Sequence, residues 1–343
     1  MNRIHRDESA LYHACGYSCD HAIYLALGSD AFFITDGRYA IDAQEHLRDA
    51  ELIVARDLAK EAAKRIRKST VTKIAYDPKE WDVYTFERLR TKTKVRWKSK
   101  PNMSQKLRII KSHEAIECLD EAARIGAEAF DAFAARIDAE GLGANETQLF
   151  RMAQEVLGGD EGRALSFEPI VAIGANAAKP HAHPDPDTVL RPGDLLLFDA
   201  GIKYRRYCSD RTRTVRVKKG FAFDTHQRFK DKQTQKAYDT VRKAHDKAIA
   251  KARSGMRANQ IDAIARNIID KAGFGKYFVH STGHGVGLDI HELPVIASRS
   301  RTRIEDGMVF TVEPGIYLPG TFGIRIEDTV AMENGRARVL GLS

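Results

Sequence analysis

The sequence predicts an α/β protein of the α+β type, with a smaller N-terminal domain and a larger C-terminal domain. Three observations support this prediction. A chain of 343 residues, 43% of them hydrophobic, is long enough for two domains with cores of their own. Apolar runs of strand length alternate with segments of helical periodicity. Residues 98–104 are polar and contain Pro101, which marks a linker, so we place the domains at residues 1–104 and 105–343.

The N-terminal domain is expected to contain a β-hairpin, because the apolar runs 23–27 and 31–35 flank the turn Gly28-Ser29-Asp30. Basic residues alternate with others over residues 91–98, which places their charges on one face of an exposed strand. The other elements expected in this domain are two helices and a strand, at residues 41–49, 57–67 and 73–76.

The C-terminal domain is expected to begin with helices. Ser112 can cap a long helix over residues 114–139, and Asn145 begins another that runs toward Leu157. Strands then alternate with two further helices, at residues 239–253 and 258–272.

The chain is basic, with 55 Lys and Arg against 47 Asp and Glu. The basic residues are concentrated in residues 88–111 and 218–236, but no aromatic-interleaved RNA-binding motif accompanies them. We interpret both stretches as solvated surface and expect no nucleic-acid partner. No run of about 18 apolar residues is present, so no membrane partner is expected.

Four cysteines in a chain of this length do not make a disulfide framework, and Cys15 and Cys19 lack the second pair of a zinc knuckle. The residues from Met1 to Asp7 lack the apolar segment of a secretory signal. A reduced, cytoplasmic protein is the simplest account of these observations.

Two expected hairpins each bring two carboxylates together. Asp199 closes the apolar run 195–198, and Asp210 lies beyond a polar break of hairpin length. If Tyr204-Arg205 is the loop, the two Asp residues face each other, with Cβ atoms roughly 4.5–5.5 Å apart.

The same construction recurs downstream. The strands 309–313 and 323–327 flank a turn, and Gly320 is the midpoint of Glu313 and Glu327. Like charges this close repel unless a cation lies between them.

A single Asp or Glu in such a strand is usually solvated, but two mirrored hairpins and the glycine-flanked His284 favour a metal site. Four carboxylates carry four negative charges, which two divalent cations cancel. One imidazole among oxygen ligands suits manganese first, with cobalt, iron and zinc as alternatives. The predicted ligands are Asp199, Asp210, His284, Glu313 and Glu327.

Two other motifs in this region are rejected. His291-Glu292 begins like a zincin helix, but Pro294 would break the helix and position 295 is Val. The glycines around His284 resemble a dinucleotide loop, but its third glycine position is occupied by Leu288. We interpret these glycines as letting the backbone pass close to the metals while His284 points inward.

These residues lie in motifs that resemble, in order and spacing, those of the pita-bread metallopeptidases, most of all prolidase (Xaa-Pro dipeptidase) and aminopeptidase P. The resemblance covers residues 107–343 strongly, and residues 31–39 resemble the family's creatinase-like N-terminal domain more weakly. The motifs are Phe198-Asp199-Ala200-Gly201, Ser209-Asp210-Arg211-Thr212, Ser281-Thr282-Gly283-His284-Gly285, His291-Glu292, Val312-Glu313-Pro314-Gly315 and Arg325-Ile326-Glu327-Asp328.

The resemblance implies a C-terminal pita-bread domain that hydrolyses the peptide bond before proline in Xaa-Pro dipeptides or short peptides, and a homodimer. It implies that His181 and His291 contact the substrate and the tetrahedral intermediate, with His183 as a competitor for the first role. Glu313 would also relay a proton to the leaving nitrogen. The chain departs from the family in a shortened N-terminal domain and in a longer, more basic region over residues 218–235.

Substrate length is the open question. Arg299 falls where prolidases place an arginine that binds the dipeptide carboxylate, and a bidentate arginine suits that role. Arg325 is the other cationic candidate for substrate binding, although its place beside Glu327 favours orientation of a ligand. The alternatives are an aminopeptidase P that acts on longer peptides and a metal-free binding module. All five ligand positions are filled, which argues against the second.

Overall fold

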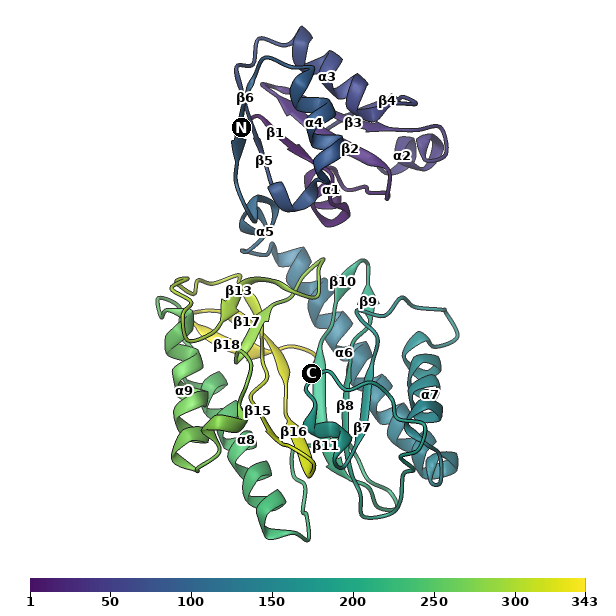
Figure 1. Ribbon diagram of the computed structural model, residues 1–343, viewed down its shortest axis with the longest axis vertical. Coiled ribbons are helices and arrows are strands. Elements are labelled where there is room, and N and C mark those ends of the chain that lie inside the picture. Colours follow the sequence, from purple (N-terminus) through teal and green to yellow (C-terminus); the bar gives the residue numbers. More distant parts are fainter. Residues whose placement is uncertain (343) are drawn as a thin grey trace. The chain divides into compact units, whose positions relative to one another are not determined.

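The computed structural model describes residues 1–342, which form two compact units that divide between Arg108 and Ile109 (Figure 1). Each unit combines helices with β-sheet, which confirms the predicted α/β class. Among the described helices, none has the length and apolar character that a membrane span requires.

The first unit is built on one six-stranded sheet with the strand order β4-β3-β2-β1-β5-β6. Leu11 of α1 and Ala43 of α2 belong to one apolar cluster of the sheet, and Ala62 of α3 and Leu89 of α4 to another. Its elements are β1 (Arg3–His5), α1 (Glu8–Cys15), β2 (Ala22–Leu27), β3 (Asp30–Thr35), α2 (Ala40–His46), β4 (Glu51–Val54), α3 (Leu58–Lys68), β5 (Lys73–Tyr76), α4 (Val83–Thr91), β6 (Arg96–Ser99) and α5 (Met103–Leu107).

The expected hairpin is confirmed, with Ile23 of β2 paired to Ile34 of β3. The expected linker at residues 98–104 is wrong for much of its length. Lys98 pairs with Ala75 in the sheet, and residues 103–104 begin α5. The alternating basic stretch also forms a shorter strand than expected, because Thr91 ends α4 and only residues 96–99 form β6. The polar side chains of this stretch are compatible with an edge strand, which exposes one side to water.

The second unit contains the remaining helices and strands. They are α6 (His113–Arg136), α7 (Glu146–Gly158), β7 (Ile170–Ile173), β8 (Leu195–Ala200), β9 (Lys203–Tyr204), β10 (Tyr207–Cys208), β11 (Arg211–Arg216), α8 (Lys232–Lys251), α9 (Ala258–Lys271), β12 (Gly283–Gly285), β13 (Glu292–Ile296), β14 (Val309–Val312), β15 (Gly315–Leu318), β16 (Phe322–Arg325), β17 (Asp328–Glu333) and β18 (Arg336–Val339).

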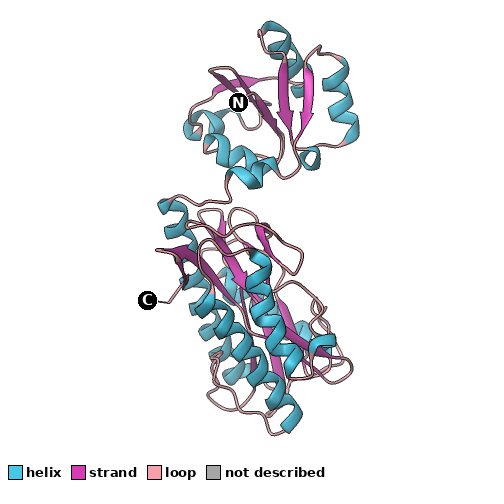
Figure 2. Ribbon diagram, turned by 90° about the vertical axis from the view of Figure 1, so that its left-hand side faces the viewer, coloured by secondary structure: helices cyan, strands magenta, loops and turns pink. Residues whose placement is uncertain are grey.

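This unit has two halves, each with its own helix pair and sheet. In the first half, α6 and α7 bury Phe130, Phe133 and Leu149 against the sheet β11-β8-β7. In the second half, α8 and α9 bury Val241 and Ile261 against strands that include those of the sheet β13-β12-β14-β17-β18. Figure 2 shows the long helices running alongside the strands.

Local capping explains where the helices of this unit begin. The Ser112 side chain accepts from the Ala115 amide at the start of α6, and Asn145 forms a capping box with Gln148 at the start of α7, as predicted. Asp231 caps α8, so that helix begins seven residues before the expected position 239. The last part of the basic stretch 218–236 is therefore helical. Phe221 and Phe223, which lie in the same stretch before the helix, are buried in the core.

Candidate metal centre

The first carboxylate-bearing hairpin has a different register from the expected one. Tyr204 pairs with Tyr207, and Asp199 pairs with Thr212 rather than with Asp210. The loop is Arg205-Arg206, whose φ angles of 45° and 73° suit a two-residue turn that matches the strand twist. Neither residue is Gly or Asn, so composition did not mark the turn, and the predicted loop was one residue too early.

The correction leaves both Asp side chains on one face. Moving a two-residue loop by one position changes the register by two, and alternate residues of a strand point the same way. Asp199 and Asp210 are therefore diagonal neighbours instead of direct partners. The position opposite Asp210 is Gly201, where an added Cβ would lie 1.9 Å from the Ser209 carbonyl oxygen.

The second register is confirmed. Val312 pairs with Asp328 on one side of the two glutamates, and Gly315 pairs with Arg325 on the other. Glu313 and Glu327 thus occupy opposed positions between two paired stretches, with the turn centred at Gly320.

The two hairpins are joined directly to each other. The Glu327 amide donates to the Thr212 carbonyl at 3.0 Å, and the Thr212 hydroxyl donates to Oε2 of Glu327 at 2.6 Å. Thr214 accepts from the Arg325 amide one step further along. This bridge between β11 and the β16–β17 strands brings the two carboxylate pairs into one centre.

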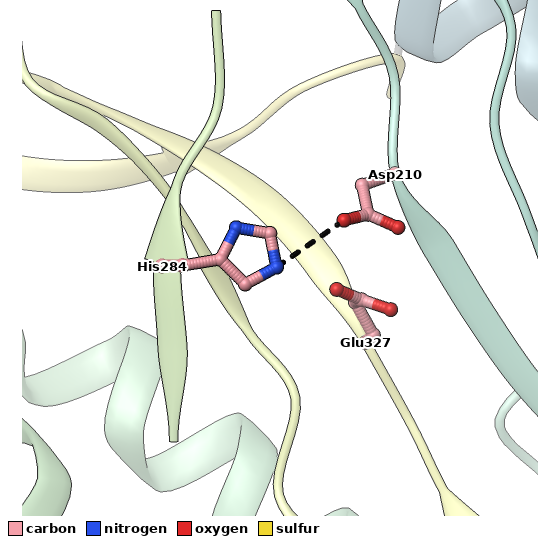
Figure 3. Close-up of side chains that lie close together, drawn as sticks. All are labelled: Asp210, His284 and Glu327. Carbon is pink, nitrogen blue, oxygen red and sulfur yellow. Dashed lines mark ion pairs between the residues drawn. The ribbon is translucent and has the colours of Figure 1, made fainter. Parts of the chain in front are cut away.

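His284 points into this centre from β12. Figure 3 shows its imidazole facing the carboxylates of Asp210 and Glu327, each from a different segment of the chain. One ligand atom from each of these three residues lies within 4.8 Å of the others. Nε2 of His284 is 3.5 Å from Asp210 Oδ2 and 3.4 Å from Glu313 Oε1.

The glycines on either side of His284 have a steric role. An added Cβ at Gly283 would lie 1.8 Å from the Thr311 carbonyl oxygen, and one at Gly285 would lie 2.2 Å from the Leu293 carbonyl oxygen. The close neighbours are therefore the backbones of β14 and β13. These glycines thus allow a close approach to adjacent strands, and their approach to the metals stays a prediction.

Arg325 holds the remaining carboxylate. Its guanidinium, 4% exposed, donates to Asp199 Oδ2 at 2.5 Å and to the Tyr317 hydroxyl at 2.7 Å. It also donates to Thr212 Oγ1 and to the Pro180 carbonyl. Four acceptors within the protein therefore occupy the side chain that was also considered for substrate binding.

The residues present fit divalent cations. Burial, reinforced by neighbouring carboxylates, raises the pKa of Asp210 and Glu327 well above their usual values, and burial raises the pKa of Glu313 to about 7. Oδ1 of Asp199 is buried without a hydrogen-bond partner in the described part of the chain. Buried carboxylates and an orphaned oxygen are stabilised when cations bind between them.

His284, the predicted histidine ligand, is in a setting that favours the form that metals bind. Burial lowers the pKa of His284, which favours the neutral imidazole. Its Nδ1 lies 3.1 Å from the Gly285 carbonyl oxygen. A hydrogen bond from Nδ1 to that carbonyl leaves Nε2, the nitrogen that faces the carboxylates, free to bind an ion.

The two histidines predicted to act on substrate lie in exposed positions beside the centre. The His291 ring centroid is 4.4 Å from that of His284, and burial lowers the pKa of His291. His181 lies in the loop after β7, close enough to His291 and His280 to lower the pKa of both electrostatically. Arg299, Arg301 and Arg303 are exposed in the segment between β13 and β14.

Sequence reasoning assigned no role to His280 or Tyr317. His280 Nε2 is 2.9 Å from the Tyr317 hydroxyl, and its Nδ1 is 4.0 Å from Glu313 Oε2. Burial, with Arg325 nearby, lowers the pKa of His280 to about 4. Strand alternation offered a signal, because Tyr317 lies four residues after Glu313 and shares its face.

A buried ionic cluster of Arg213, Asp328 and His245 adjoins the backbone of Glu327. Arg213 donates to the Glu327 carbonyl at 2.5 Å and to Asp328 Oδ1 at 2.6 Å, and His245 Nε2 is 3.2 Å from Asp328 Oδ2. The sequence neighbours of His245 are polar, but its own side chain is buried. It is 4% exposed because it lies on the inner face of α8.

The comparisons with known proteins identify the class. The chain belongs to metallopeptidase family M24, whose sequence profile matches residues 117–334, and the creatinase/prolidase N-terminal domain matches residues 4–110. The fold is therefore a pita-bread domain preceded by a creatinase-type domain, as predicted. An uncharacterized peptidase of Bacillus subtilis is 34% identical over 330 residues, covering 94% of this chain and 89% of the relative.

Solved structures resemble the chain over its whole length. A Xaa-Pro dipeptidase from Bacillus anthracis superposes with a TM-score of 0.91 at 30% identity, covering 100% of this chain and 93% of that one. An X-Pro aminopeptidase from Thermotoga maritima gives a TM-score of 0.86 at 27% identity, with 100% and 95% covered. The chain is thus similar to enzymes with both of the specificities considered above.

Proposed function

We propose that this protein is a Xaa-Pro dipeptidase that uses two divalent metal ions. The observation that carries the proposal is the convergence of two carboxylate pairs and His284 in a chain of family M24. The whole-length similarity to the Xaa-Pro dipeptidase from Bacillus anthracis supports the choice of substrate.

The ions would be held by the set Asp199, Asp210, His284, Glu313 and Glu327. Oxygen ligands with a single imidazole favour manganese, and cobalt, iron and zinc are the alternatives to be tested. When bound, such ions lower the pKa of a water to near neutrality and polarise the scissile carbonyl.

The protein's own groups complete the proposed reaction. Glu313, which the resemblance also assigns to proton transfer, relays a proton toward the leaving nitrogen. His181 and His291 donate hydrogen bonds to the oxygen that becomes negatively charged. Arg325 fixes the orientation of Asp199, with Tyr317 and His280 continuing the same network.

A dipeptide presents a free carboxylate directly after proline. We assign Arg299 to bind it, because its fork of donors matches a carboxylate. An aminopeptidase P would instead need room for a longer chain at this position, and the similarity to the X-Pro aminopeptidase makes that the second candidate.

The proposal is tested by metal analysis of the purified protein together with hydrolysis of Gly-Pro and Gly-Pro-Xaa peptides. We expect about two bound divalent ions in each chain and faster cleavage of the dipeptide. Faster cleavage of the tripeptide would establish aminopeptidase P, and a metal-free protein without hydrolysis would refute both.

The cysteines bear on the compartment in which the enzyme acts. All four cysteines are unpaired and buried, which fits a reducing cytoplasm. A homodimer and a division of the domains at residues 104 and 105 remain predictions, to be checked by light scattering and by limited proteolysis.

A further inference from the structure

One fully buried carboxylate of the second unit lies outside the metal centre. Glu146, in the first turn of α7, is 0% exposed. Its Oε1 accepts from the Ile173 amide at 2.6 Å, and its Oε2 accepts from the Asp185 amide at 2.7 Å and from Asn176 Nδ2 at 2.6 Å. A single side chain therefore holds the loop over residues 173–185 at both ends and at Asn176.

Glu146 is not needed as the helix cap. Asn145 and Gln148 already satisfy the first amides of α7 through their reciprocal capping box. Burial raises the pKa of Glu146, so its place inside the protein has an electrostatic cost. Three N–H donors, all from the loop, offset that cost, because hydrogen bonds to an ionised acceptor are strong.

The loop that Glu146 holds carries His181. Its first residue, Ile173, ends β7, and apart from the short turn at Asn176–Ala178, residues 174–185 form no helix or strand. A further bond within the loop, from Asn176 Nδ2 to the His183 carbonyl at 2.9 Å, starts from the same amide that Glu146 binds. The loop conformation is thus organised around the Glu146 carboxylate.

The other side of the loop meets the metal centre. The Pro180 carbonyl, one residue before His181, accepts from Arg325, which also holds Asp199. Gly323 of β16 packs against the loop so closely that an added Cβ would lie 1.7 Å from the Ala177 carbonyl oxygen. The loop is therefore fixed between the Glu146 carboxylate and the strand that bears Arg325.

We propose that Glu146 is a positioning residue that clamps the loop of residues 173–185 and so places His181 over the metal centre. The inference rests on the proposed function, in which His181 acts on the substrate. Glu146 itself touches neither the substrate nor the ions.

The test is Glu146→Gln, which keeps the shape but turns an amide N–H₂ toward N–H donors. We expect hydrolysis of Gly-Pro to fall about 10- to 100-fold, because a small misplacement of a reacting group is costly. Metal content should stay at the wild-type level. Glu155→Gln is the matched control, because Glu155 lies on the same helix with an exposed side chain that pairs with Arg136 at the surface.

The double variant with His181→Ala separates positioning from general weakening. If Glu146 acts through His181, Glu146→Gln should cost little further activity once His181 is absent. An equal loss in both backgrounds would overturn the proposal, as would wild-type activity in Glu146→Gln.

Hydrogen exchange gives a measurement that does not depend on activity. Amides of residues 173–185 should exchange faster in Glu146→Gln, with β8 and β11 unchanged. If the wild-type protein shows no Xaa-Pro hydrolysis, the proposed function fails, and unchanged exchange in the loop would separately refute the clamp. If Glu146→Gln does not fold, Glu146→Asp keeps the charge but shortens the reach, and the same loop-confined exchange and partial loss of activity are expected.

Discussion

The two strand pairs that supply carboxylates to the metal centre differ in what sets their register. In the second pair the turn contains Gly320, with φ of 68°, and the predicted facing of Glu313 and Glu327 is the observed one. In the first pair the turn is Arg205-Arg206, and Asp199 faces Thr212. The register can be predicted from the sequence where the turn contains a typical turn residue such as glycine. It cannot be predicted where the turn consists of two arginines.

The pairs also differ in what neutralises them. Asp199 of the first pair is bound by the cationic Arg325, whereas Glu327 of the second pair receives the neutral hydroxyl of Thr212. Each half also carries one of the two loop histidines that are proposed to act on the substrate, His181 in the first and His291 in the second. Matched substitutions in the two halves therefore test whether the halves contribute equally to catalysis.

The largest effect is expected from removing one ligand charge in each pair. Asp210→Asn in the first pair and Glu327→Gln in the second should each abolish activity, because either change leaves the ions with one negative charge fewer. Activity and metal content measured on both variants test this. Wild-type turnover in a variant that has lost its metal would refute the dinuclear site.

The histidine of the second half should have the next largest effect. His291→Ala should lower kcat by about 10²–10³ and leave the metal content unchanged, because it removes a hydrogen bond that forms in the transition state. Steady-state kinetics with metal analysis of the same sample provides the measurement. Loss of both metals would instead identify His291 as a ligand.

The histidine of the first half should affect binding more. His181→Ala should lower kcat by a similar or smaller factor than His291→Ala and raise KM further, because the resemblance places His181 against the substrate. The two variants should be compared with the same dipeptide. If their kcat and KM effects are indistinguishable, the assigned division of roles between the halves is wrong.

Arg299 lies in the second half alone, and a smaller effect is expected there. Arg299→Ala should raise KM for Gly-Pro about tenfold, equivalent to roughly 1.4 kcal/mol, because the carboxylate of the dipeptide substrate loses a bidentate partner. Arg301→Ala is the neighbouring control. An unchanged dipeptide KM, together with faster tripeptide cleavage, would favour aminopeptidase P.

The smallest expected effect concerns stability after metal removal. Burial raises the pKa of Glu313 to about 7 in the folded metal-free protein, whereas an unfolded Glu titrates near about 4.3. The folded chelated protein then binds more protons than the unfolded chain, so its stability falls as pH rises through this interval. The difference in Tm between metal-saturated and chelated protein should widen from about pH 5.5 to about pH 8. A constant difference would contradict the charge-repulsion account.

Much of the fold was predictable because its signals are local. Ser112 and Asn145 mark helix starts by side-chain capping, and the β2–β3 hairpin is marked by its turn. The start of α8 was missed because its Lys-rich first turns look like solvated loop, although Asp231 is a capping residue.

The non-local part of the site was less accessible. The sequence identified residues that lie together in the centre, but it contained no sign that the Thr212 hydroxyl would bind Glu327, which is 115 residues away. The role of Glu146 was hidden for the same reason, since two of its three partners are the backbone amides of Ile173 and Asp185, 27 and 39 residues downstream, and a backbone amide carries no mark of residue type. Such contacts depend on tertiary packing.

The glycines beside His284 limit how this protein can change by mutation. Every other amino acid has a Cβ, and at Gly283 or Gly285 that atom would meet a carbonyl oxygen of a neighbouring strand. At Gly320 no atom lies within 4 Å of the same position. In a saturation library selected for growth on a proline dipeptide, the codons for residues 283 and 285 should remain glycine, while residue 320 should admit asparagine. Strands β13 and β14 thus restrict which amino acids can replace Gly283 and Gly285, although neither glycine is a predicted metal ligand.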